Sequence, residues 1–110
     1  MKIKISKLKP HPINDEIYDV SNLTDLKQSI KRFGQLEPIH INKKNTIISG
    51  HRRYYAMRQL DIKECDVIQK DFDNEIISIV EFNRKRKKTA GDHIREFDYL
   101  NKEFKKQIGR

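Results

Sequence analysis

Apolar and polar residues alternate in short stretches that predict strands along much of the chain. Residues 2–6 alternate with a period of two, which is typical of a half-buried strand. Three further short apolar runs predict strands, and they cover residues 38–41, 46–49 and 65–68. Polar residues 43–45 predict a turn that joins the first two of these runs as a hairpin. Two prolines predict that residues 9–14 lack regular structure, because proline fixes the backbone and lacks an N–H donor.

Apolar residues three or four positions apart predict helices between these strands. The first helix carries an apolar stripe from Leu23 to Phe33 and is followed by Gly34, a residue type that commonly ends helices. A second helix begins directly after Gly50, and a third is capped by Asp73. The mixture predicts an α+β fold, a small mixed sheet with helices packed against it.

The last predicted helix begins at Thr89 or Asp92 and has one apolar stripe, formed by Ile94, Phe97, Leu100 and Phe104. An exposed stripe on a terminal helix needs a partner to cover it. We therefore expect residues 1–89 to form the binding domain and residues 90–110 to begin a truncated region, with a helix that is extended or swapped.

Composition and charge narrow the class of protein. The 110 residues suit one domain of ordinary size, and no apolar run reaches the roughly 18 residues that a membrane span needs. A single cysteine, Cys65, excludes an internal disulfide framework and a multi-cysteine zinc site. The formal net charge of +8 favours polyanionic partners such as nucleic acid or nucleotides. We expect a cytoplasmic protein with no membrane partner.

The most specific chemistry is expected where the strand at 46–49 runs into a helix. Gly50 permits close approach of a ligand to the backbone, and the first N–H groups of a helix attract anions. Arg52 and Arg53 follow, and their guanidinium groups suit phosphate oxygens. The pattern predicts a phosphate site, and a surface turn with two solvated arginines is the alternative.

A run of five basic residues forms the second candidate site, and it comprises Arg84, Lys85, Arg86, Lys87 and Lys88. Such a run attracts a phosphate backbone, although a solvated helix end is the plainer alternative. The four histidines show no metal-ligand spacing. Cys65 lies in a predicted strand, where we expect a small core residue rather than a nucleophile.

Together these segments resemble the ParB/sulfiredoxin superfamily, specifically its N-terminal ParB-like domain, which is often labelled a ParB-like nuclease domain. The resemblance covers nearly the whole chain, and it is carried by Leu8–Asn14, the helix Leu26–Gly34, Gly34–Ile39, Ser49–Ala56 and Asn83–Arg86. It implies the fold of that superfamily.

Partition proteins of this family bind CTP through three patches, and the resemblance carries these over residue by residue. The first patch ends in a turn similar to Glu37–Ile39, where Pro38 would approach the nucleotide with backbone groups. The second resembles Gly50–Arg53, where the glycine, both arginines and the helix N-terminus would hold the triphosphate. The third resembles Phe82–Arg86, where Asn83 would face magnesium and Arg86 would face a phosphate.

Two departures from the family pattern bear on catalysis. His51 and Phe82 stand where the second and third patches have glutamate. A carboxylate would help to hold a metal ion, so nucleotide binding carries over better than hydrolysis. Sulfiredoxins have cysteine at the position of His51, and free-serine kinases of the family have aspartate at the position of Ser49, so neither activity is expected here.

The sequence therefore predicts a ParB-like module of plasmid or chromosome partition, or of regulation, that binds a nucleoside triphosphate such as CTP with Mg²⁺. Its site would comprise Pro38, Gly50, His51, Arg52, Arg53, Asn83 and Arg86. Non-specific DNA contacts would come from Arg84, Lys85, Lys87 and Lys88. The expected partners are DNA, a second copy and a partition ATPase, with nucleoid or plasmid association and at most weak triphosphatase activity. The alternative is a small enzyme of the same superfamily, a nuclease or small-molecule kinase, with His51 as general base.

Overall fold

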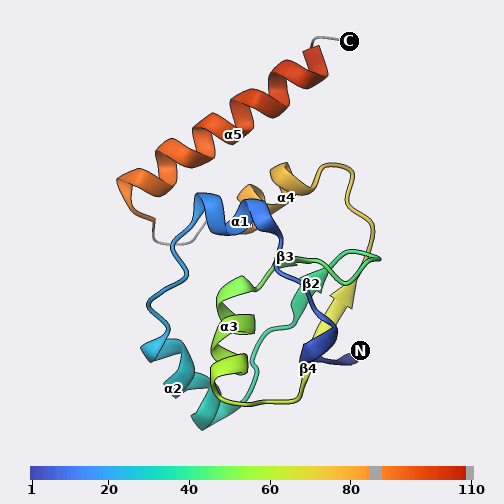
Figure 1. The fold of residues 1–110 in the computed structure, drawn as a ribbon, viewed down its shortest axis with the longest axis vertical. Coiled ribbons are helices and arrows are strands. Elements are labelled where there is room, and N and C mark those ends of the chain that lie inside the picture. The colour runs from blue at the N-terminus through green and yellow to red at the C-terminus, as the bar shows by residue number, and fades with distance from the viewer. Residues whose placement is uncertain (85–87, 109–110) are drawn as a thin grey trace.

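The sheet lies toward one side of the computed structural model, which describes residues 1–84 and 88–108 (Figure 1). In this part of the chain four strands pair in the order β1-β4-β2-β3. Their bounds are Lys2–Lys4 for β1, Ile39–Ile41 for β2, Ile47–Ser49 for β3 and Glu64–Gln69 for β4. The β1–β4 and β2–β3 pairs are antiparallel and the β2–β4 pair is parallel, so the prediction of an α+β fold with a small mixed sheet is confirmed.

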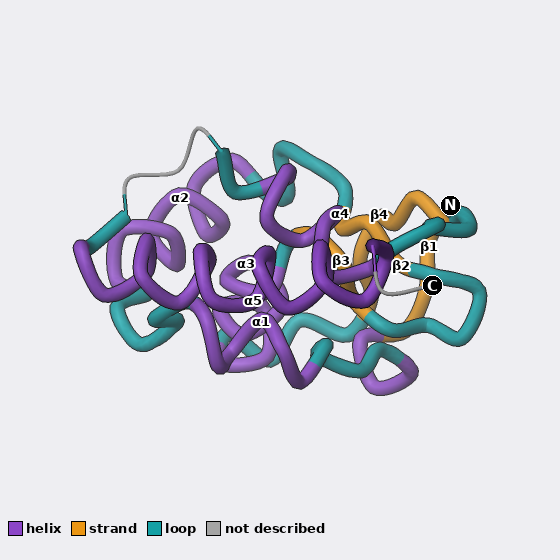
Figure 2. The backbone as a smooth tube through the Cα atoms, turned by 90° about the horizontal axis from the view of Figure 1, so that it is seen from above, coloured by secondary structure: helices purple, strands orange, loops and turns teal. Residues whose placement is uncertain are grey.

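Helices cover both faces of this sheet, and α5 forms an outer layer (Figures 1 and 2). The helices are η1 (a 3₁₀ turn, Ile5–Lys7), α1 (Pro12–Ile17), α2 (Thr24–Phe33), α3 (His51–Gln59), α4 (Glu75–Phe82) and α5 (Ala90–Ile108). The α3 helix packs on β2 and α2, whereas α4 packs on β3 and α5. The two faces of the sheet have separate hydrophobic cores, and neighbouring residues of β3 point into opposite ones. Ile47 belongs to the core under α3, and Ile48 belongs to the core that contains Ile79 of α4.

The starts of α1 and α4 differ from the sequence-based prediction. Helix α1 begins at Pro12, within the stretch expected to lack regular structure. Proline is tolerated at the first helical position because its missing N–H would have no intrahelical partner, and His11 Nδ1 caps the helix by accepting the Ile13 N–H at 3.2 Å. The cap of α4 is Asn74 rather than Asp73, and its Oδ1 accepts the Ile77 N–H at 3.0 Å.

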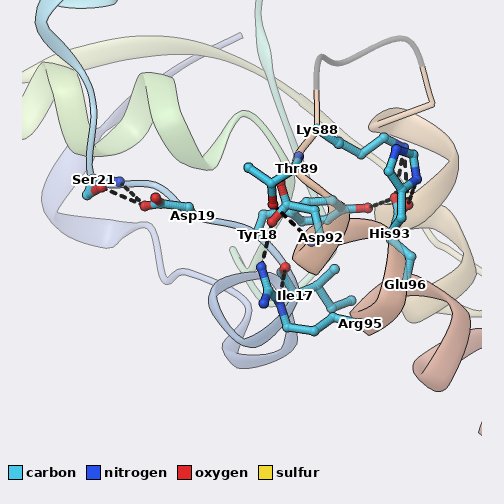
Figure 3. Close-up of polar contacts among 10 residues, drawn as sticks. All are labelled: Ile17, Tyr18, Asp19, Ser21, Lys88, Thr89, Asp92, His93, Arg95 and Glu96. Atoms are coloured by element: carbon cyan, nitrogen blue, oxygen red, sulfur yellow. Dashed lines mark hydrogen bonds and ion pairs between the residues drawn. The ribbon is translucent and has the colours of Figure 1, made fainter.

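The outer helix α5 buries polar residues and exposes much of its apolar stripe. Asp92, Glu96 and Glu103 are buried, whereas Ile94, Phe97 and Phe104 are each at least 60% exposed. Polar bonds join the helix to the body: Arg95 Nε donates to the Ile17 carbonyl at 2.6 Å, and the Tyr18 hydroxyl donates to Glu96 (Figure 3). The helix itself was predicted, but the face that it buries was not.

No helix in the described part of the chain combines the length and the apolar character needed to cross a membrane.

Candidate phosphate-binding site

The junction of β3 and α3 depends on a glycine. Gly50 is the N-cap of α3 and has φ +106°, a left-handed conformation that side chains rarely adopt. A Cβ at this position would lie 3.0 Å from Ile39 Cγ1 and 3.1 Å from Arg53 Nη1. Gly50 also has no side chain that could cap the first N–H groups of the helix, the groups that favour anions. The sequence thus ends β3 and starts α3 with an anion-attracting turn.

A hollow of about 300 Å³ opens at this junction. Its lining includes Ser49, the segment Gly50–Arg53, Phe82 and Asn83. The fold therefore brings together most of the predicted site from the β3–α3 junction and the end of α4. Pro38 lies beside the hollow, where its carbonyl accepts a bond from Arg53, and Arg86 is outside the described residues.

Both arginines of the junction are anchored by backbone carbonyls. Arg52 Nη2 donates to the Asn22 carbonyl at 2.6 Å. Arg53 Nη1 donates to the Pro38 carbonyl at 3.0 Å, and its Nη2 lies 3.1 Å from Glu37 Oε2. A guanidinium group carries five N–H donors, so these bonds orient it and use only part of its capacity. Burial lowers the pKa of Arg53 and Glu37 opposes this, yet arginine remains charged at neutral pH.

His51 is fixed inside the protein. Its side chain is buried, and its Nε2 accepts the backbone N–H of His11 at 3.0 Å. A nitrogen that accepts this bond carries no proton, so the neutral ring is protonated on Nδ1. His51 therefore holds the segment before α1 against the start of α3, and its Nε2 lone pair is not available to act as a general base.

The end of α4 contributes an amide and an aromatic ring to the hollow. Asn83 Nδ2 donates to the Ile79 carbonyl at 2.7 Å, and this bond holds the amide at the edge of the hollow. The Phe82 ring lies 4.8 Å from the ring of His40, centroid to centroid. Burial, then Lys70 and Arg53, lower the pKa of His40, so this ring is neutral at neutral pH. Sequence reasoning gave His40 no role, because nothing in the chain's periodicity pairs positions 40 and 82.

The basic run after α4 is only partly within the described residues. Arg84 is exposed and its Nη1 lies 3.4 Å from Glu81 Oε2. Lys88 was expected to face solvent as a DNA contact, but the structure buries it. Its ammonium lies 2.9 Å from Glu96, and both side chains are 8% exposed. The fold of α5 over Tyr18 encloses this pair (Figure 3). Lys85 and Lys87, like Arg86, lie outside the described residues.

The hollow offers few ligands for a metal ion. Among the described residues no group of three or more His, Cys, Asp or Glu side chains could hold one. The described lining supplies the Asn83 amide oxygen and the Ser49 hydroxyl, and Phe82 stands at the position where the family pattern has glutamate. Magnesium usually binds one or two carboxylates together with substrate phosphates and waters. These donors fit only an ion that is carried mainly by the phosphates of a ligand.

Comparison with known proteins identifies the family of the chain. The family model for the ParB N-terminal domain matches residues 1–82. A probable chromosome-partitioning protein ParB of Rickettsia prowazekii (strain Madrid E) is 30% identical over 106 residues, which cover 93% of this chain and 37% of that protein. The chain thus spans little more than a third of this relative.

Two solved structures share the fold. The C2221 form of a Pnob8-like ParB-N domain superposes with a TM-score of 0.77 at 20% identity, over 99% of this chain and 46% of that chain. The C-terminally truncated chromosome-partitioning protein ParB from Caulobacter crescentus, complexed with CTP-gamma-S, gives a TM-score of 0.65 at 22% identity, over 100% of this chain and 64% of that chain. The fold and the matched residues place this chain in the ParB N-terminal domain family.

Proposed function

We propose that this domain binds a nucleoside triphosphate, with CTP favoured, in the hollow at the N-terminus of α3. The observation that carries the proposal is the convergence of Gly50, Arg52 and Arg53 on one hollow. The two guanidinium groups and the helix N-terminus all favour negative charge. The relative solved with CTP-gamma-S supports a nucleotide as the source of that charge.

The anchoring of the arginines supports binding in a preformed site. Backbone carbonyls of Asn22 and Pro38 hold the two guanidinium groups before any ligand arrives. Less side-chain entropy is then lost on binding, so more of the interaction energy appears as affinity. The volume of about 300 Å³ lies at the lower end of small-molecule sites.

We expect magnesium to bind together with the nucleotide rather than to the protein alone. Asn83 would approach it with its amide oxygen, and Arg86 would contact a phosphate, as the family pattern implies. Because the described lining lacks a carboxylate, we expect magnesium to strengthen binding only through the phosphates that it bridges. Because the described lining has no carboxylate and His51 Nε2 already accepts a hydrogen bond, we expect the site to bind the nucleotide rather than hydrolyse it.

Within a partition protein, we propose that the domain couples nucleotide binding to a second copy and to DNA. Arg84, Lys85 and Lys87 remain the proposed DNA contacts of the basic run, and a partition ATPase remains a proposed partner. The similarity to chromosome-partitioning proteins over 93% of the chain supports this setting. Plasmid segregation and transcriptional regulation are settings of the same kind.

Isothermal titration of the four nucleoside triphosphates, with and without Mg²⁺, tests the site. Arg52→Ala should weaken binding about tenfold, which is the loss of roughly 1.4 kcal/mol expected for a charge-assisted contact. The matched control is Arg58→Ala, on the last turn of the same helix and outside the hollow. If Arg52→Ala and Arg53→Ala both bind every nucleotide as the control does, the proposed site is wrong.

A further inference from the structure

Four lysines from three segments gather at the turn between β2 and β3, far from the start of α5. Lys43 and Lys44 belong to this turn. Lys9 lies against it, because its N–H donates to the Asn45 carbonyl at 3.0 Å and its carbonyl accepts the Ile47 N–H at 2.8 Å. Lys70 lies at its base, where its N–H donates to the Ile41 carbonyl at 3.1 Å. We name Lys9, Lys43, Lys44 and Lys70 the lysine surface.

The positive charge of the lysine surface is not neutralised within the described structure. All four side chains are exposed, and none takes part in an ion pair between described residues. A second hollow, separate from the phosphate site, lies beside Lys43 and Lys44 and contains two carboxylates. One of them, Glu75, already bonds His11 and Asn42. Asp71, the other, is exposed. Positive groups therefore predominate, and a partner with many negative charges would reduce their mutual repulsion.

The turn that carries Lys43 and Lys44 is held in place by side-chain hydrogen bonds. Asn42 Oδ1 accepts the N–H groups of Lys44 and Thr46, each at 2.9 Å. Asn42 Nδ2 donates to Glu75 at 2.7 Å, and Gln69 Nε2 donates to Asn45 Oδ1 at 3.2 Å. The backbone under the ammonium groups is therefore preorganised, so a partner need order only the lysine side chains.

We propose that the lysine surface docks the phosphate backbone of double-stranded DNA. The proposal rests on the proposed function only for the choice of DNA as the partner. Separate ammonium groups on a protruding turn fit a row of phosphates better than one triphosphate, which needs a concave site. The turn residues Asn42–Asn45 are polar, so they offer no apolar anchor to a lipid bilayer.

This location differs from the one that the sequence indicated. The basic run leads into α5, where Lys88 is enclosed with Glu96. The start of α5 and the β2–β3 turn lie at opposite sides of the molecule in both Figure 1 and Figure 2. A duplex on the lysine surface would therefore contact the sheet end of the domain, away from the start of α5, and the contacts proposed for the basic run would form a separate site.

Salt-dependent DNA binding by the whole chain tests the proposal. Fluorescence anisotropy of a labelled duplex gives the slope of log Kd against log salt concentration, which changes by about 0.9 for each phosphate contact. Lys43→Gln combined with Lys44→Gln should lower this slope by about 1.8, and Lys9→Gln with Lys70→Gln should lower it further. The matched control is Lys31→Gln with Arg32→Gln, two exposed cations on α2.

The outcomes separate this proposal from the nucleotide site. If the wild-type chain binds DNA and the Lys43/Lys44 variant keeps the slope of the control, the lysine surface is wrong and the proposed function stands. If the wild-type chain binds anionic vesicles in a lysine-dependent way but no duplex, DNA is the wrong partner. Nucleotide titration of the Lys43/Lys44 variant should match the wild type, because neither lysine lines the nucleotide hollow.

Discussion

Helices α3 and α5 bury opposite kinds of surface. The α3 helix buries Tyr54, Ala56 and Met57 against the sheet, with His51 as the polar residue buried at its first position. The α5 helix buries Asp92, Glu96 and Glu103, and its residues Ile94, Phe97 and Phe104 are exposed. Tyr99 and Leu100 supply the apolar part of the α5 contact, and they are only partly buried.

The difference teaches how each helix is held. Apolar burial adds up over area and does not depend on one partner, so α3 is fixed by many small contributions. A buried polar contact depends on a matched partner, and losing one partner leaves the other unsatisfied. The attachment of α5 should therefore be sensitive to single charges and to pH, whereas the packing of α3, which carries the phosphate site, should not.

Breaking the buried pair of α5 should have the largest effect on stability. Glu96→Ala leaves the Lys88 ammonium buried without its partner and removes the acceptor of the Tyr18 hydroxyl. We expect the free energy of unfolding to fall by about 3 to 5 kcal/mol, or α5 to detach. Urea unfolding and amide hydrogen exchange of α5 measure the two outcomes.

Two comparison variants sharpen this test. Asp98→Ala removes an exposed carboxylate of the same helix and should change stability by less than about 0.5 kcal/mol. Replacing both partners, with Lys88→Met and Glu96→Leu, should recover much of the loss because no buried charge remains. Equal stability of Glu96→Ala and Asp98→Ala would show that the pair does not hold the helix.

At the phosphate site, replacing Gly50 should lower both stability and nucleotide binding, because the backbone conformation of this residue shapes the site. Gly50→Ala forces a side chain into φ +106° and places its Cβ 3.0 Å from Ile39 Cγ1 and 3.1 Å from Arg53 Nη1. We expect a loss of about 1 to 3 kcal/mol in stability, together with weaker nucleotide binding as Arg53 shifts. Thermal denaturation and nucleotide titration measure these effects.

Gly34 provides a matched control for Gly50. It also has a positive φ, +76°, but a Cβ there meets nothing within 4 Å. Gly34→Ala should therefore cost the conformational strain alone and leave nucleotide binding unchanged. If both variants bind nucleotide like the wild type, the close contact at Gly50 does not shape the site.

Sequence periodicity predicted the parts of the fold that follow from local pattern. The β2–β3 hairpin and the start of α3 after Gly50 were placed correctly, because a strand, a glycine and a helix leave distinct signals in neighbouring residues. The same local signal brought Arg52 and Arg53 into the candidate site before the fold was known. Pro12 misled the prediction because proline both breaks helices and starts them.

Contacts between distant segments could not be predicted in this way. The bond from the His11 N–H to His51 spans 40 residues, and the bond from Tyr18 to Glu96 spans 78. For α5, periodicity located the apolar stripe but not the neighbours of the helix. Tyr18 and Lys88 surround its inner face, so a polar face is the one buried.

Acid should loosen α5 before it disturbs α3. At Asp92, burial raises the pKa, but bonds from Thr89 and Arg95 outweigh it and hold the pKa below the usual 3.8. The Asn74 amide, opposed by burial, holds the pKa of Glu103 below 4.5. A lowered carboxyl pKa contributes stability above the unfolded-state value, and this stability is lost as pH falls through the folded-state value. We therefore expect α5 to lose attachment below about pH 4.5.

Melting temperatures between pH 6 and pH 3 measure this dependence. Asp92→Asn combined with Glu103→Gln should flatten the decline, because the carboxylates that must be protonated are gone. Asp98→Asn, at an exposed position of the same helix, should leave the decline unchanged. A double variant with the wild-type slope would place the acid sensitivity elsewhere in the fold.

The smallest effect is expected on the exposed stripe of α5. Phe97→Ser combined with Phe104→Ser removes two rings that are 70% and 60% exposed, so no core contact is lost. The free energy of unfolding of the dilute chain should change by less than about 0.5 kcal/mol. Ile79→Ala, which truncates a fully buried residue of α4, should cost about 2 to 5 kcal/mol by the same urea measurement. A loss of comparable size in the double serine variant would mean that the stripe is covered in solution, and the contrast between α3 and α5 would then hold only for the isolated chain.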